Sequence, residues 1–271
     1  MLLLRAELRK VAHPAIAMSL CGLIVIAISL QALVLREEVA SAADPVPAPT
    51  LLDPLGAAVI ACEQVASLLG VGLAAVIAAV GVASEFTSGT IGAVVAVEGR
   101  RGRLVAAKAA AAFMVLTVTV VVLAASLALA GVAAKAVLGE RIASVEPTAL
   151  SEALSVFARL PLVLLVLAML GVLAGLVFRS EVGAATALAG LTALSLPLTN
   201  LSPVNALTLP HWVAAWMGFG PPGYPYDFVW SYAPSDVGVA TAGAVLALVV
   251  CASLAAATLT LRATDLVPTS D

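Results

Sequence analysis

The amino-acid sequence predicts an all-α integral membrane protein, and three observations carry that prediction. Apolar residues make up 62% of the 271 positions, whereas a soluble domain is usually about 45–50% apolar. Charged residues make up only 11%, and they gather in short segments between long uncharged stretches. Those stretches reach the roughly 20 residues that an α-helix needs to cross a hydrocarbon layer about 30 Å thick.

Six such stretches are predicted to span the membrane, and each is rich in Ala, Leu and Val with scattered Gly. The bilayer core offers no water to backbone amides, so spanning helices satisfy their own hydrogen bonds, and small residues let them pack closely. A β-barrel would need short alternating segments, which do not occur here. We predict a single transmembrane domain over residues 1–271, with spans at about 14–35, 56–83, 104–134, 154–178, 182–201 and 237–261.

The distribution of charge predicts how these spans are oriented in the plasma membrane. With both termini in the cytoplasm, most Lys and Arg residues fall in inner segments, in agreement with the positive-inside rule, and most acidic residues face outward. Residues 1–13 place basic side chains among leucines, which predicts an amphipathic helix on the inner lipid surface. The inner basic residues are Arg5, Arg9, Lys10, Arg100, Arg101, Arg103, Lys108, Arg179 and Arg262.

The inner segment 84–103, between the second and third predicted spans, predicts a short helix. Glu85 stands near its start, where a carboxylate suits the positive end of the helix dipole, and Gly99 can end it. An ordinary positive inner loop has a similar composition, so composition alone leaves both interpretations open. The segment has an apolar face at Ile91, Val94 and Val95, and a basic anchor at Arg100, Arg101, Arg103 and Lys108.

The longest outer segment, residues 202–236, holds all three tryptophans and all three tyrosines. These side chains favour the membrane–water interface, and a short helix at about 211–219 can lie in the outer leaflet. The segment is either an aromatic belt or a substrate gate. Ionisable residues inside spans are functional candidates by default. The possible pathway or gate residues are therefore Glu63, Arg159, Trp212 and Trp216.

The sequence offers no constellation for catalysis or metal binding. Its three cysteines are widely spaced, and its two histidines, His13 and His211, lie near opposite faces, so neither a metal site nor a disulfide framework is indicated. No GxxxxGK[ST] phosphate loop is present. We therefore expect a chain that is not itself an enzyme, carries no cofactor and has no nucleic-acid partner.

The segment 84–103 resembles the corresponding loop of type-2 ABC exporter permeases, the membrane-spanning subunits of ATP-driven exporters. The shared features are Glu85 at the inner end of the second span, the pair Gly89–Thr90, a short helix, a basic turn and Lys108. Residues 4–10 are similar to the family's amphipathic N-terminal helix. The six-span layout covers essentially the whole chain.

The resemblance implies that the short helix is a coupling helix, which docks in a groove of a separate subunit that binds and hydrolyses Mg-ATP. Two permease subunits, identical or homologous, would enclose the export pathway. The alternatives are an ion-coupled secondary transporter, for which polar residues at the midplane are expected, and a non-transporting scaffold subunit. The residues implied to couple to the ATPase are Glu85, Gly89, Thr90, Ile91, Val94 and Val95.

Overall fold

All regular structure that the computed structural model describes is helical. The described residues are 54–66, 68–98, 101–138, 147–199, 204–218 and 237–263, so the first predicted span and the amphipathic segment 1–13 lie outside them. The all-α prediction is confirmed for this part of the chain. Its elements are α3 (Pro54–Ala66), α4 (Leu68–Thr87), α5 (Thr90–Glu98), α6 (Arg101–Leu138), α7 (Pro147–Phe178), α8 (Glu181–Thr199), the 3-10 helix η1 (Val204–Leu207), α9 (Leu209–Met217) and α10 (Val239–Ala263).

Three helices in the described part are long and apolar enough to cross a membrane. They are Arg101–Ala133 of α6, Ala153–Phe178 of α7 and Val239–Ala263 of α10, which match the predicted spans 104–134, 154–178 and 237–261. Helix α8 lies where the fifth span is predicted, but its apolar part, Glu181–Ser195, is shorter. The orientation of the chain in a membrane stays a prediction.

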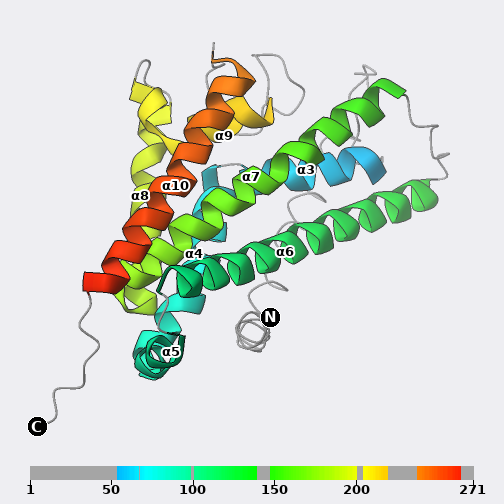
Figure 1. The fold of residues 1–271 in the computed structure, drawn as a ribbon. Coiled ribbons are helices and arrows are strands. Elements are labelled where there is room, and N and C mark those ends of the chain that lie inside the picture. The colour runs from blue at the N-terminus through cyan, green and yellow to red at the C-terminus, as the bar shows by residue number, and fades with distance from the viewer. Residues whose placement is uncertain are drawn as a thin grey trace, which may run out of the picture.

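The second predicted span, residues 56–83, coincides with two described helices, and residue 67 between them lies outside the described residues. The structure divides the span between α3 and α4, which run in different directions (Figure 1). The polar residues Glu63 and Gln64 near the end of α3 offer a physical reason, because a straight span would carry them into hydrocarbon at a high free-energy cost.

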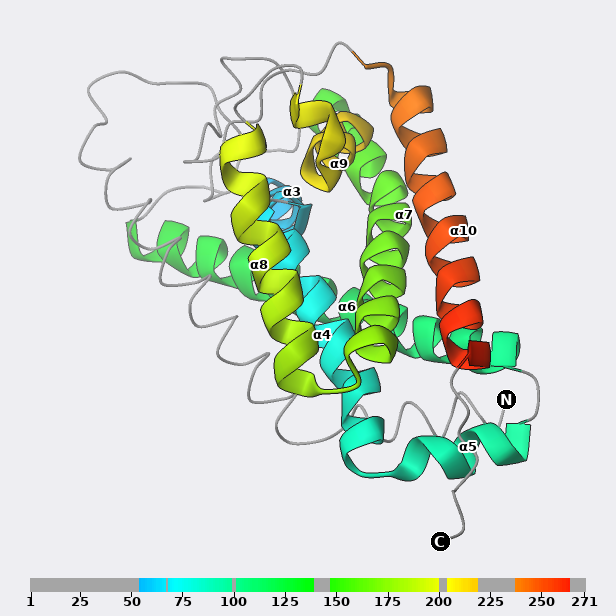
Figure 2. The same ribbon diagram turned by 90° about the vertical axis from the view of Figure 1, so that its left-hand side faces the viewer.

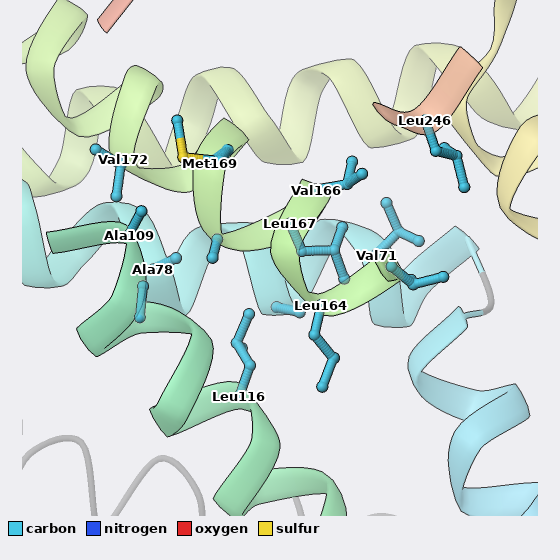
Figure 3. Packing of buried hydrophobic residues seen from close by; sticks show 14 of the residues in the cluster. Val71, Ala78, Ala109, Leu116, Leu164, Val166, Leu167, Met169, Val172 and Leu246 are labelled. Atoms are coloured by element: carbon cyan, nitrogen blue, oxygen red, sulfur yellow. The ribbon is translucent and has the colours of Figure 1, made fainter. Parts of the chain in front are cut away.

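Helix α7 is the centre of the bundle and packs on α4, α6, α8 and α10. Figures 1 and 2 show α4, α7, α8 and α10 running between two ends of the molecule, while α6 crosses them obliquely. We call one the α5 end, where α5 and the last turn of α10 lie. We call the other the α9 end, where α9 and the start of α10 lie. In the core, Leu164 and Leu167 of α7 lie between α4 and α6 (Figure 3).

Two glycines bring α7 unusually close to α4. A Cβ atom at Gly171 would lie 2.6 Å from the carbonyl oxygen of Ala75, and one at Gly175 would lie 2.8 Å from that of Ala79. Larger side chains would therefore force the backbones apart. This small-xxx-small spacing is the close packing that membrane helices use in place of the hydrophobic effect.

The connection between α7 and α8 consists of only Arg179 and Ser180. Arg179 ends α7 in a left-handed conformation with φ 54°, which is uncommon for a residue other than glycine. The Ser180 hydroxyl then accepts a hydrogen bond of 2.9 Å from the N–H of Gly183, which caps the start of α8. The two helices therefore form a tight hairpin.

Candidate functional site

At the α5 end, the side chains of Glu85 and Lys108 form a buried ion pair. Glu85 lies in the last turn of α4 and Lys108 near the start of α6, and each residue is only 3% exposed. The Lys108 nitrogen Nζ lies 2.5 Å from Oε2 of Glu85. Burying a single charge is strongly unfavourable, and a hydrogen-bonded partner of opposite charge offsets that cost. The pair therefore fixes the end of α4 against the start of α6.

The turn between α4 and α5 consists of glycine and small hydroxyl residues. Gly89 has φ 69°, a left-handed conformation that glycine adopts without strain, and its N–H donates to the carbonyl of Phe86. The hydroxyls of Ser88 and Thr90 lie 3.0 Å apart, and the Thr90 hydroxyl also donates to the carbonyl of Glu85 at 3.5 Å. The predicted pair Gly89–Thr90 thus ends one helix and begins the next.

Helix α5 lies across the end of the bundle (Figure 2) and packs its apolar face against its own chain. Ile91 is only 4% exposed, and Val94 and Val95 are half-buried against the main core. In this arrangement a partner can reach the exposed turn at Ser88 and Thr90 but not the side chain of Ile91. The contact of this helix with an ATPase stays a prediction.

Arg101, the first residue of α6, connects the start of α6 to the C-terminal end of α10. Its guanidinium nitrogen Nη1 donates to the backbone carbonyls of Leu261 at 2.8 Å and of Arg262 at 2.7 Å. A cation at the C-terminus of a helix also interacts favourably with the helix dipole. Of the predicted basic anchor, Arg103 is exposed and Arg100 lies outside the described residues. Arg101 therefore anchors the start of α6 to another helix of the same chain.

A further contact at this end joins α4 to the α7–α8 turn. The guanidinium carbon of Arg179 lies 6.0 Å from the centre of the Phe86 ring, at the outer limit of a cation–π interaction. Such a contact is worth about 0.5–1 kcal/mol at an exposed site, so it is weak beside the buried ion pair.

At the α9 end, two of the predicted gate residues, Arg159 and Trp216, contact each other. The indole Nε1 of Trp216 donates to the backbone carbonyl of Arg159 at 2.8 Å, and the Arg159 guanidinium donates to the carbonyl of Met217 at 3.2 Å. Gly218 ends α9 with φ 78°, and a Cβ there would lie 2.6 Å from Nη1 of Arg159. The ring of Trp216 also packs on Gly243 of α10, where a Cβ would lie 2.8 Å from Cε3.

The other two predicted gate residues are not brought into this contact. The Trp212 indole donates to the backbone carbonyl of Ala206 at 2.8 Å, which ties α9 to the 3-10 helix before it. Glu63 lies in α3, and its side chain lies outside the described part of the structure. The role of Glu63 in a pathway or gate therefore stays a prediction.

Sequence reasoning missed a buried polar group near the start of α9. Asn205, Thr208 and His211 are 9%, 4% and 6% exposed, and Nε2 of His211 has no hydrogen-bond partner among the described residues. Helix α9 has nine residues, too few to span a bilayer. Burial lowers the pKa of His211, so the neutral imidazole is favoured. A lone histidine in an apolar segment gave no signal of this environment.

Comparisons of the chain with protein-family models, with curated proteins and with solved structures find no match. The functional interpretation therefore rests on the geometry of the two ends of the bundle.

Proposed function

We propose that this chain is the permease subunit of an ATP-driven exporter and that a separate ATPase docks at its α5 end. The two partners supply different parts of the cycle. The ATPase binds and hydrolyses Mg-ATP, and the permease converts the movement of the docked helix into opening and closing of a pathway. A second permease subunit, identical or homologous, completes the pathway in the plasma membrane.

The observation that carries this proposal is the buried ion pair of Glu85 and Lys108 at the base of α5. A loop that merely connects two membrane helices does not need a charged pair in its interior, because surface charges can remain in water. Here the pair joins the end of α4 to the start of α6, the two helices between which α5 stands in the chain, and Arg101 joins the start of α6 to the end of α10. We therefore expect a force applied to α5 to reach the bundle through the ends of α4 and α6.

The turn that precedes α5 is exposed and consists of glycine and hydroxyl residues. The turn residues Thr87, Ser88, Gly89 and Thr90 are all exposed, and hydroxyl groups both donate and accept hydrogen bonds. We expect this turn to contact the ATPase, with Ile91 holding α5 on its own chain. The ion pair would then be a positioning element, and its charges need not touch the partner.

The test is to purify the tagged chain from its native membranes and to assay ATP hydrolysis. We expect an ATPase to copurify in fixed proportion and the complex in nanodiscs to hydrolyse Mg-ATP. Glu85→Ala should lower substrate-stimulated hydrolysis while the chain still inserts in the membrane. If no ATPase copurifies, or if the variant hydrolyses ATP as the parent does, the proposal is wrong.

A charge exchange provides the matched control. The double variant Glu85→Lys with Lys108→Glu reverses the pair but keeps opposite charges in contact. If the pair acts by positioning α5, the double variant should recover more hydrolysis than either single variant. If Glu85 instead binds the ATPase directly, the double variant should remain as defective as Glu85→Ala.

The alternative that a specific observation favours is an ion-coupled transporter, because a buried ionisable pair can also take part in proton transfer. The two functions differ in the purified chain alone. An ion-coupled transporter reconstituted without partners would move its cargo in response to a pH gradient. The exporter subunit would not.

A further inference from the structure

Helix α10 is one of the described helices that run between the two ends of the bundle, and it has a side-chain contact near each of its own ends. It is one uninterrupted helix of 25 residues, which at about 1.5 Å per residue is about 37 Å long. It packs along α7, meets α9 near its start and meets α6 near its end. Figure 1 shows it running from beside α9 to the α5 end. A displacement of one end of such a rod must move the other end.

Arg101 holds the C-terminal end of α10. One guanidinium nitrogen donates to two successive carbonyls, those of Leu261 and Arg262, which are among the carbonyls that lack partners within the helix. Arg101 begins α6, and α5 ends at Glu98, so only two residues separate it from α5. A movement of the start of α6 would therefore be passed to the end of α10.

Gly243 meets Trp216 near the other end of α10. The absence of a side chain at Gly243 lets the indole ring lie against the helix backbone, and the same ring donates to the carbonyl of Arg159 on α7. Trp216 is therefore held between α7 and α10. A small shift of α10 relative to α7 changes the space available to this ring.

We propose that Arg101 and Gly243 are positioning residues that couple the α5 end to the aromatic helix α9 through α10. The functional meaning of this coupling rests on the proposed transport function, since it would join a docked ATPase to a gate. The mechanical coupling itself is a property of the chain alone. Its test can therefore fail or succeed independently of whether an ATPase binds.

The first experiment uses Trp216 as an intrinsic reporter in the full-length chain in nanodiscs. Trp212→Phe and Trp230→Phe leave Trp216 as the sole tryptophan. Arg101→Ala should then shift the emission of Trp216 to longer wavelength and increase its quenching by acrylamide. Arg101→Lys, which keeps a charge and a donor, should give a smaller shift.

The matched control is Arg103→Ala, which removes a charge of the same sign from an exposed position two residues further along α6. We expect it to leave the emission of Trp216 unchanged. An equal response to Arg101→Ala and Arg103→Ala would show a general charge effect and overturn the proposal. An unchanged emission in Arg101→Ala would overturn it as well.

The reciprocal experiment perturbs the α9 end and reads the α5 end. A bimane label is attached through Arg262→Cys in a chain whose native cysteines are replaced. Gly243→Ala, whose methyl group would displace Trp216, should change the label's emission, whereas Gly238→Ala, which has open space around it, should not. If the Arg101→Ala variant loses helical content, the label experiment alone tests the coupling, because it leaves Arg101 in place. An unchanged label in Gly243→Ala contradicts the coupling.

Discussion

The α5 end and the α9 end of the bundle are held together by different chemistry. At the α5 end, charged side chains interact with each other and with helix termini, as in the buried pair of Glu85 and Lys108. At the α9 end, Trp216 packs on a glycine and donates to a backbone carbonyl. The first arrangement depends on a buried ion pair, whereas the second depends on the packing of an aromatic ring, with the Arg159 guanidinium donating to the carbonyl of Met217 beside it.

This difference determines how each end should respond to substitution. A buried charge that loses its partner lowers the free energy of unfolding by a large amount, since little water reaches the charge to replace that partner. A packed aromatic ring instead loses free energy in proportion to the contacts and hydrogen bonds that are removed. Substitutions at the α5 end should therefore cause larger losses of unfolding free energy than substitutions at the α9 end. The following substitutions check this contrast.

The largest effect is expected for Glu85→Ala, which leaves the Lys108 ammonium buried without its carboxylate. Removal of one partner of a buried pair typically costs about 3–5 kcal/mol. We expect this loss in the free energy of unfolding, measured by circular dichroism of the purified chain in mixed micelles with increasing denaturing detergent. An unchanged unfolding midpoint would mean that the pair is accessible to water.

The next effect compares two glycines that share a left-handed conformation at opposite ends, Gly218 and Gly89. Alanine in this conformation costs about 1–2 kcal/mol. At Gly218 the new methyl group also meets Arg159, whereas at Gly89 no atom of the described residues lies within 4 Å. Gly218→Ala should therefore destabilise the chain more than Gly89→Ala in the same unfolding assay. Equal losses would show that the Arg159 side chain moves away from the new methyl group without loss of stability.

A smaller effect is expected for Trp216→Phe, which keeps an aromatic ring against Gly243 but removes the hydrogen bond to the carbonyl of Arg159. A single hydrogen bond of this kind contributes about 0.5–1.5 kcal/mol. The unfolding free energy should fall by at least that amount, because the smaller ring also loses packing contacts, but by less than for Glu85→Ala. A loss as large as that of Glu85→Ala would contradict the contrast between the two ends.

The smallest effect concerns pH and arises from His211. Burial lowers its pKa in the folded chain, so the unfolded chain binds more protons in the range between the two pKa values. Stability is therefore fully present above the unfolded value, near pH 6.5, and falls as the pH drops below it. We expect the unfolding temperature to decrease on acidification, and His211→Gln should reduce that decrease. An identical pH profile in the variant would exclude His211 as the cause.

The parts of the fold that the sequence predicts well are those set by local composition. The long apolar runs of α6, α7 and α10 predict continuous helices, and the pair Gly89–Thr90 marks a real helix boundary. The division of residues 56–83 between α3 and α4 is not indicated by hydropathy, which averages over polar residues such as Glu63. Helix boundaries set by a few polar groups are invisible to a window of about 20 residues.

The arrangement of the candidate sites could be predicted only in part. The sequence singles out both Glu85 and Lys108, but their contact arises from the way α4 and α6 cross. The contact of Arg101 with Leu261 joins positions far apart in the chain, and no local pattern indicates it. The same holds for Gly243, which the composition of α10 marks only as one small residue among many.

The hairpin of α7 and α8 constrains how the protein is made. With only Arg179 and Ser180 between them, the ribosome releases the two helices almost as one segment, and we expect them to enter the membrane together. The apolar stretch of α8, Glu181–Ser195, is shorter than the roughly 20 residues that favour insertion of a lone helix. The strongly apolar α7 that precedes it would retain α8 in the membrane, so lengthening this turn should cause part of the newly made chains to leave α8 outside the bilayer.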